Sequence, residues 1–163
     1  PFMKQLYESG FPQNGGLQAC VYFDENSLNY VPARELEGLY SCLDFFHTVD
    51  DPFSKELLAA YAKKFPDTKY QFTAGSASTG MYRGIRLYEA AVNSTKGDTA
   101  REAVSAALDK AKIDKGPGGG AEMVPGKMHA KMNMYIAQCK KVDGDKLRWD
   151  VISKFNMVDP KEC

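Results

Sequence analysis

Short apolar runs and longer stripes of helical period alternate along the chain, and the first run anchors the prediction of the fold. This run, Leu17–Phe23, lies between the turn sequence Asn14-Gly15-Gly16 and the polar sequence Asp24-Glu25-Asn26. A short apolar run bounded by turn residues is typical of a strand that is buried on both faces. The same reasoning predicts a second strand over Gly38–Leu43. Apolar residues that precede Gly10 predict a short helix at the start of the chain.

Two amphipathic helices are predicted in the middle of the chain. Asp51 is a suitable N-cap because Pro52 follows it at the first helical position, and this helix would run to Phe65. Its apolar stripe consists of Phe53, Leu57, Leu58, Tyr61 and Phe65. The next helix, Ser76–Asn93, carries one apolar face that we expect to pack in a soluble core, formed by Met81, Ile85, Tyr88 and Val92.

The last third of the chain predicts a capped helix, a glycine-rich turn and a β ribbon. The capping box Thr99-Ala100-Arg101-Glu102 predicts a helix whose inward residues are Val104, Ala107, Leu108 and Ala111. Pro117–Gly120 lacks the spacing and the hydroxyl residue of a phosphate-binding loop, so we interpret it as a turn. Met132–Gln138 and the alternating residues around Trp149 predict two strands, joined by a tight hairpin at Asp143-Gly144.

Composition narrows the class of protein. The 163 residues suffice for a domain with a real core, and 44% hydrophobic with 26% charged residues is ordinary for a soluble globular protein. Lys+Arg and Asp+Glu both number 21, which argues against the clustered basic excess of a nucleic-acid-binding protein. No apolar run is long enough to span a membrane. The abrupt start at Pro1-Phe2-Met3, without a visible signal peptide, is typical of a mature or trimmed form.

Cysteine and histidine spacing predicts neither a metal site nor a nucleophile. The four cysteines form no CxxC pair and lie far from His47 and His129: Cys20, Cys42, Cys139 and Cys163. A Cys20–Cys42 disulfide remains an alternative to two buried free thiols. His47 lies near Asp50 and Asp51, but a third ligand is missing. With no hydrolase or cofactor motif either, we expect a protein that is not an enzyme and binds no cofactor.

Polar residues at the exit of the first predicted strand are the candidate binding residues. In open α/β sheets, ligands bind beyond the carboxyl ends of parallel strands. Asp24, Glu25, Asn26 and the neighbouring Tyr22 stand at such a position. A carboxylate with Tyr22 or Asn26 could hold an ammonium or amide nitrogen by charge-assisted hydrogen bonds. The alternative interpretation is a solvated turn that only ends the strand.

Several phrases of the sequence resemble a known family when they are taken together with the order of the elements. These phrases are Gly38-Leu39, the stretch 82–91 (YRGIRLYEAA) and the Gly116-Pro117 turn before the loop that contains His129. In this order and spacing they resemble the carboxy-terminal part of type I periplasmic solute-binding proteins of ABC importers. Within that superfamily, the sequence is similar to the group that binds amides, urea and branched-chain amino acids. The resemblance spans nearly all 163 residues.

The resemblance implies an α/β fold: the carboxy-terminal portion of a two-lobed receptor with three-layer α/β lobes and a terminal β ribbon. Residues 1–49 would belong to the second lobe, residues 50–131 to the first lobe, and residues 132–163 to a ribbon that returns to the second lobe. Asp24 and Glu25 match the place where the family's second lobe supplies a carboxylate to the ligand. The family is more than twice as long, so the chain would lack most of its first lobe.

The leading functional hypothesis is the receptor component of an ABC importer for small amides, urea or branched-chain or polar amino acids. Its partners would be the small polar ligand and an ABC permease, in the periplasm or outside the cell. We expect the chain to associate either with the missing amino-terminal lobe or with itself. The alternatives are a ligand-sensing regulator on the same fold and a self-associating fragment that binds no ligand.

Overall fold

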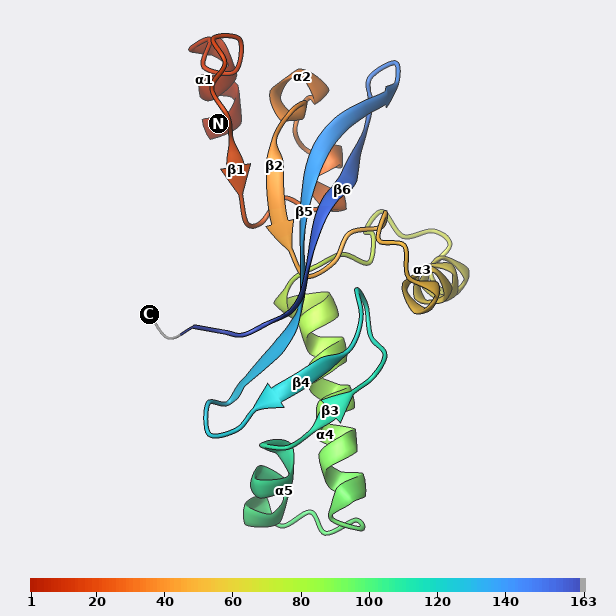
Figure 1. Cartoon of the computed structure of the whole chain (residues 1–163). Helices are drawn as coiled ribbons and strands as arrows, with labels where there is room; N and C mark the ends of the chain where they lie inside the picture. Colours follow the sequence, from red (N-terminus) through yellow and green to blue (C-terminus); the bar gives the residue numbers. More distant parts are fainter. Residues whose placement is uncertain (162–163) are drawn as a thin grey trace.

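The computed structural model describes residues 1–161 as an elongated α/β molecule, in which one long strand runs through an upper and a lower half (Figure 1). The upper half holds the chain start and the β ribbon; the lower half holds the longest helix. The elements are α1 (Phe2–Glu8), β1 (Ala19–Cys20), η1 (Glu25–Asn29), α2 (Ala33–Leu36), β2 (Tyr40–Leu43), α3 (Pro52–Lys64), η2 (Ser76–Gly80), α4 (Met81–Ser94), α5 (Arg101–Leu108), β3 (Lys112–Ile113), β4 (Ala121–Val124), β5 (His129–Asp143) and β6 (Lys146–Val158).

Strand β5 is the axis of a six-stranded sheet with the order β1-β2-β5-β4-β3, and β6 also pairs with β5. Its first residues pair with β4 in the lower half, where Met132 is opposite Ala121. Its later residues pair with β2 in the upper half, where Gln138 is opposite Tyr40. Among the described strands, the β1–β2 pair alone is parallel. The two halves therefore share a single backbone ladder.

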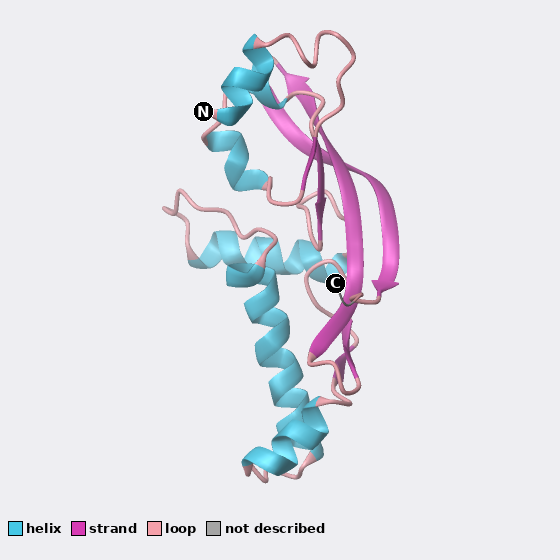
Figure 2. Ribbon diagram, turned by 90° about the vertical axis from the view of Figure 1, so that its left-hand side faces the viewer, coloured by secondary structure: helices cyan, strands magenta, loops and turns pink. Residues whose placement is uncertain are grey.

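Each half has its own hydrophobic core. The upper core surrounds Trp149 and includes Leu36, Phe46 and Tyr135. The lower core is smaller and lies between α4 and the β3–β4 strands, with Leu87, Ala91, Ala111 and Ala121 as its buried members. Figure 2 shows the helices on one side of the sheet, so no helix of the described chain covers the other side.

The first apolar run is not the buried strand that its pattern predicts. Only Ala19–Cys20 forms a strand, and this strand is at the edge of the sheet with β2 as its one neighbour. Leu17 is 79% exposed and Val21 is 57% exposed. The prediction is wrong because a strand is buried on both faces only when other elements cover it on both sides. Residues 27–37 contain the end of η1 and the short helix α2.

Helix α3 confirms the predicted cap, since the Asp51 carboxylate accepts a hydrogen bond from the Ser54 main-chain N–H at 2.8 Å. Its apolar stripe is only half-buried, and Ser54 is its one buried residue. The expected core face of α4 is wrong. Met81, Ile85 and Tyr88 are 51–60% exposed, and the opposite face is buried, with Arg83, Leu87 and Ala91. The reason is that α5 and the short strands pack on that opposite face, whereas no element within residues 1–161 covers the other face.

The β ribbon is confirmed. Asp143 pairs with Lys146 around the two-residue turn Gly144-Asp145, and Gly144 adopts the positive φ of 52° that such turns require. Trp149 is 1% exposed, and its indole N–H donates to the Asp24 carbonyl at 2.8 Å. The capping box is wrong, because Ala100 is the N-cap of α5 and no side chain caps that helix. Strands β3 and β4 were not predicted.

The cysteines in the described part of the chain, Cys20, Cys42 and Cys139, are free thiols, which is the reading without a Cys20–Cys42 disulfide. Cys163 lies outside the described residues. Burial raises the pKa of the Cys139 thiol to about 12, so this thiol is inert as a nucleophile. Within residues 1–161 no helix combines the length and the apolar character needed to cross a bilayer.

Candidate functional site

Asp24 uses its carboxylate to begin η1. Oδ1 accepts hydrogen bonds from the main-chain N–H of Asn26 at 3.0 Å and of Ser27 at 3.3 Å, as an N-cap does. Its main-chain carbonyl accepts the Trp149 indole N–H, so the ribbon fixes the position of the turn. The turn that begins with Asp24 is therefore held rigidly against the upper core.

Glu25 is turned inward. It is only 5% exposed, and its Oε1 accepts the His47 main-chain N–H at 2.6 Å. Its other oxygen, Oε2, has no hydrogen-bond partner among the described residues. Burial raises the pKa of the Glu25 carboxyl above its ordinary value, although His47 and the hydrogen bonds from main-chain N–H groups oppose that shift. Glu25 therefore presents a buried, unsatisfied oxygen at the place where the sequence predicts a binding carboxylate.

Asn26 joins η1 to the loop that follows α3, and His47 joins the β2–α3 connection to the same loop. The Asn26 side chain accepts the Gln71 main-chain N–H at 3.1 Å and donates to the Gln71 carbonyl at 3.4 Å. The His47 ring lies 2.7 Å from the Phe72 carbonyl through Nε2. A carbonyl can only accept, so Nε2 carries the hydrogen. The Asn26 bonds join positions that lie 45 apart along the chain, and the His47 bond joins positions that lie 25 apart.

Tyr22 stands apart from this cluster. Its side chain is 84% exposed beside the open edge of β1, whereas Glu25 is buried and Asn26 is partly buried. The structure thus gathers Asp24, Glu25 and Asn26 in one rigid turn. It leaves Tyr22 free to reach a molecule in solvent.

A cavity of about 350 Å³ lies next to this cluster, between α3 and the loop 66–72. Its aromatic lining residues are His47, Tyr61, Phe65, Tyr70 and Phe72. The rings of Tyr61 and Phe65 are 5.0 Å apart, and the Tyr61 hydroxyl donates to the Tyr70 carbonyl at 3.2 Å. This cavity was not predicted from the sequence, because Tyr61 and Phe65 belong to the apolar stripe of α3 and such stripes usually pack in a core. The alternation of Tyr70 and Phe72 was the available signal.

A metal centre finds no support in the geometry. Among the described residues, no group of three or more His, Cys, Asp or Glu side chains is arranged to hold a metal ion. His47 uses its main-chain N–H and its ring for protein contacts. Asp51 caps α3, and Asp50 pairs with Lys55 at 2.5 Å.

Glu25 is expected to make the protein less stable as the pH rises. The folded state holds the Glu25 proton more tightly than the unfolded chain, since burial disfavours the carboxylate. The stabilisation is complete below the ordinary pKa of 4.5 and is lost as the pH rises through the raised pKa. Urea unfolding of the parent chain and Glu25→Gln, from acidic to neutral pH, measures this. The control is Glu56→Gln, on the exposed side of α3.

In that comparison, the difference in unfolding free energy between the parent chain and Glu25→Gln should change steadily with pH. The difference between the parent chain and Glu56→Gln should stay flat. A pH-independent difference for Glu25→Gln would show that the Glu25 carboxyl titrates alike in the folded and unfolded states.

Comparison with solved structures finds the same fold in solute-binding proteins. One is the solute-binding protein of an ABC transporter from Rhodopseudomonas palustris BisB5, in complex with 3,4-dihydroxybenzoic acid. It is 27% identical with a TM-score of 0.78, over 97% of this chain and 42% of that one. A second, from Rhodopseudomonas palustris HaA2 in complex with p-hydroxybenzoic acid, is 21% identical with a TM-score of 0.77, over 96% and 41%.

A third solved structure binds a different class of solute. It is the leucine-, isoleucine-, valine-, threonine- and alanine-binding protein from Brucella ovis, which is 16% identical with a TM-score of 0.71, over 97% of this chain and 41% of that one. At such identities the second and third likenesses show the fold alone. The chain spans about two fifths of the length of these structures. Comparison with curated proteins finds no match.

The family comparison agrees with the fold. The model of the periplasmic binding protein family matches residues 1–146. This is a family of binding proteins and not of enzymes, in agreement with the expectation from the sequence. The α/β fold class predicted from the resemblance, a partial type I periplasmic-binding-protein fold, is confirmed. The chain belongs to the periplasmic binding protein family.

Proposed function

We propose that this chain is part of the solute-binding component of an ABC importer, which holds a small polar solute where its two halves meet and works in the periplasm or outside the cell. The observation that carries the proposal is the aromatic-lined cavity of about 350 Å³ beside the Glu25–His47 cluster. Pockets of roughly 300–1,000 Å³ with a few fixed polar groups are the usual form of small-molecule sites.

The solute class follows from the chemistry of the site and of the relatives. The cavity offers aromatic faces for an aromatic or aliphatic side chain. Two of the solved relatives hold hydroxybenzoic acids and a third is named for amino acids. We therefore place small carboxylic acids and branched-chain or polar amino acids first, and small amides and urea second.

The proposed ligand contacts are Asp24, Glu25, Asn26 and Tyr22. The buried Oε2 of Glu25 lacks a partner among the described residues, and a ligand ammonium, amide N–H or phenol O–H would satisfy it. Tyr22 is free to close over the solute from the open edge of β1. Asp24 and Asn26 would hold the turn as well as contact the solute, since both already make hydrogen bonds within the protein.

The assignment of residues to lobes and the protein partner are also proposals. Residues 1–49 and 132–163 would form part of one lobe and residues 50–131 part of the other, with an amino-terminal part completing both. An ABC permease would receive the solute. A ligand-sensing regulator on the same fold is the second candidate.

Calorimetry on the gene product that contains this sequence tests the proposal. The panel consists of 4-hydroxybenzoate, leucine, acetamide and urea. Asp24→Asn and Glu25→Gln should each weaken the binding of the preferred solute by about 1.5–3 kcal/mol if they remove a charge-assisted contact, which is roughly tenfold to a hundredfold. Asn remains a good N-cap, so Asp24→Asn changes the charge and leaves the turn intact.

The matched control is Glu56→Gln, because Glu56 lies exposed on α3, the helix that lines the cavity. It should leave the affinity unchanged. If neither Asp24→Asn nor Glu25→Gln weakens binding beyond twofold, the turn serves only to cap η1. If no solute of the panel binds, the regulator or a different solute class takes precedence.

A further inference from the structure

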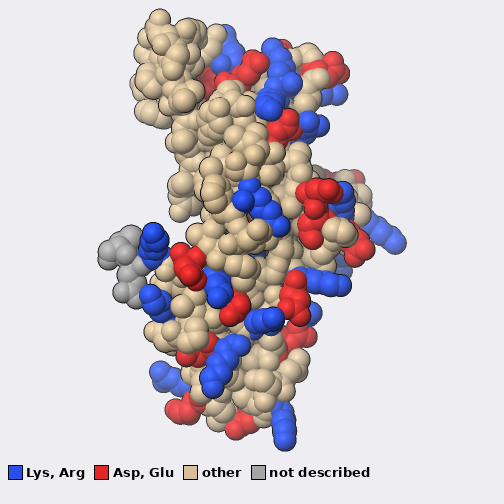
Figure 3. All heavy atoms as spheres, viewed as in Figure 1, with Lys and Arg blue, Asp and Glu red and all other residues tan. Residues whose placement is uncertain are grey.

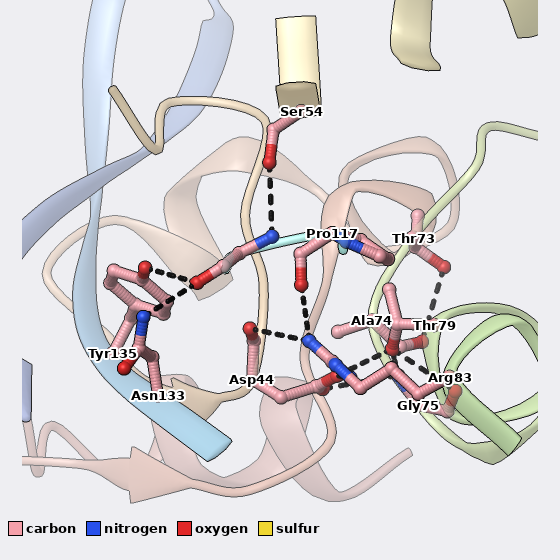
Figure 4. A network of polar contacts seen from close by, with 11 residues as sticks. Asp44, Ser54, Thr73, Ala74, Gly75, Thr79, Arg83, Pro117, Asn133 and Tyr135 are labelled. Carbon is pink, nitrogen blue, oxygen red and sulfur yellow. Dashed lines mark hydrogen bonds and ion pairs between the residues drawn. The ribbon is translucent and has the colours of Figure 1, made fainter. Parts of the chain in front are cut away.

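A second polar cluster lies where the two halves join, and the solute site does not use it (Figure 4). Asp44 directly follows β2 of the upper half, and Arg83 lies in α4 of the lower half. The two side chains form an ion pair through Asp44 Oδ2 and Arg83 Nη1. The Arg83 side chain is 3% exposed and the Asp44 side chain 14%. This is the one ion pair in the described chain with both partners so deeply buried.

The Asp44–Arg83 pair makes hydrogen bonds with the neighbouring segments of the chain. Thr79 donates its hydroxyl hydrogen to Asp44 Oδ2 at 2.5 Å, and the Gly75 N–H lies 3.4 Å from Oδ1. Arg83 uses its second amino group, Nη2, to donate to the Pro117 carbonyl. One guanidinium thus joins the exit of β2 to the Pro117–Gly118 turn, while one carboxylate holds the turn that leads into α4.

The Pro117–Gly118 turn is fastened in turn to α3 and to β5. The Gly118 N–H donates to the Ser54 hydroxyl at 2.9 Å, and its carbonyl accepts from the Asn133 amide at 2.9 Å and the Tyr135 hydroxyl at 2.6 Å. Gly118 has φ 74°, and a Cβ there would lie 2.4 Å from the Asp44 carbonyl oxygen. Glycine is therefore required for this close approach.

The same place interrupts the ladder of β5. The lower pairing with β4 ends at Met132, and the upper pairing with β2 begins at Tyr135. The β5–β6 register also shifts between Met132 and Met134. Between these points β5 has neither β2 nor β4 beside it, so main-chain hydrogen bonds from those strands do not fix the angle between the halves. The side-chain network spans that gap.

We propose that Asp44 and Arg83 are positioning residues that fix the angle between the upper and the lower half, with the Pro117–Gly118 turn as the support on which the angle rests. A buried ion pair is a poor source of net stability, because desolvation offsets the attraction, but it accepts only a narrow range of geometries. The inference does not depend on the proposed function, because the residues that line the solute cavity come from α3, the loop after it and His47, and not from the lower half. The angle itself is measured without a solute.

Single-molecule FRET on the whole chain tests the proposal. Dyes are attached through non-natural residues at position 145, in the β5–β6 turn, and position 102, in α5, so that the cysteines stay untouched. Observing single chains keeps the transfer within one molecule. The parent chain should give one narrow efficiency peak. Asp44→Asn and Arg83→Met should at least double its width or split it, and Arg83→Lys should widen it less, because lysine keeps the charge but loses the contact with Pro117.

The control is Asp50→Asn, which breaks the exposed Lys55–Asp50 pair in the same connection and should leave the peak unchanged. Urea unfolding followed by Trp149 fluorescence reports the stability of the upper half separately. An unchanged efficiency peak in folded Asp44→Asn overturns the proposal. So does unfolding of the upper half by Asp44→Asn, because the pair would then maintain the fold of one half and not the angle between the two.

Discussion

In light scattering, the chain as given is expected to behave as an assembly heavier than its own 18.1 kDa. It exposes 10489 Å². A monomer of this mass exposes about 8,100 Å² by the scaling of surface with mass, so the excess is roughly 2,400 Å². That excess is comparable with a stable protein–protein interface, and at about 25 cal/mol per Å² its apolar share amounts to many kcal/mol.

Two surfaces gather several of the exposed apolar residues. One is the uncovered face of α4, with Met81, Ile85 and Tyr88. The other surrounds α1 and β1, where Figure 3 shows almost no charged side chain at the upper left of the view. Its exposed members include Phe2, Leu17 and Val21. Either a second copy of the chain or the part of the relatives that this chain does not span would cover these surfaces.

A charged substitution on the α4 surface distinguishes association through this surface from non-specific aggregation. Ile85→Lys should shift the assembly toward the monomer without loss of helix by circular dichroism. The matched control is Met128→Lys, because Met128 is equally apolar and 81% exposed but lies in the β4–β5 turn, away from both surfaces. A monodisperse 18.1 kDa monomer that binds a panel solute with micromolar affinity would show that the chain needs no further part.

Replacing Trp149 with alanine is expected to destabilise the protein by about 3–5 kcal/mol, the usual cost of removing a large buried aromatic side chain. Trp149 is 1% exposed, packs on Phe46 with ring centroids 6.0 Å apart, and holds the Asp24 carbonyl. Trp149→Phe keeps most of the packing and should cost about 1–3 kcal/mol, since it leaves that carbonyl without its donor. Urea unfolding followed by far-UV circular dichroism gives both values.

Phe155→Ala is the control, because Phe155 lies on the same strand but is about half-exposed, and it should change stability by only about 0.5 kcal/mol. Trp149 is the single tryptophan in the sequence, so its fluorescence reports this site alone. Iodide should quench it far less than free tryptophan. Equal quenching would contradict the upper core described above.

Elements with local signals could be predicted from the sequence. The Asp51-Pro52 start of α3 and the Asp143-Gly144 hairpin each depend on residues a few positions apart, and both are confirmed. The face that α4 buries could not be predicted, because either face of an amphipathic helix suits a core and the choice depends on which elements pack against it. The prediction that β1 is buried was wrong for the same reason, since an apolar run does not reveal how many strands lie beside it.

The candidate site also has features that the local sequence predicts and features that depend on distant residues. Its position after the first apolar run was visible in the sequence, but its geometry was not. Glu25 is buried because His47 and the loop after α3 close over it, and Asn26 pairs with Gln71, which is 45 positions away. The junction pair joins Asp44 to Arg83, which is 39 positions away. A single sequence contains no signal for such pairings.

The path of β5 also dictates the order in which the chain can fold. The lower half is nearly contiguous, since α4, α5, β3 and β4 follow one another between Met81 and Val124. The upper half is not contiguous in sequence. Tyr40 pairs with Gln138, and the Asp24 carbonyl accepts its hydrogen bond from Trp149, so both contacts need residues that are synthesised much later. Non-local pairings of this kind form late, because they must close a long loop first. During synthesis, the apolar residues of the first fifty positions therefore remain unprotected until the ribbon has emerged from the ribosome, and a chaperone that shields them in that interval would raise the yield of folded protein.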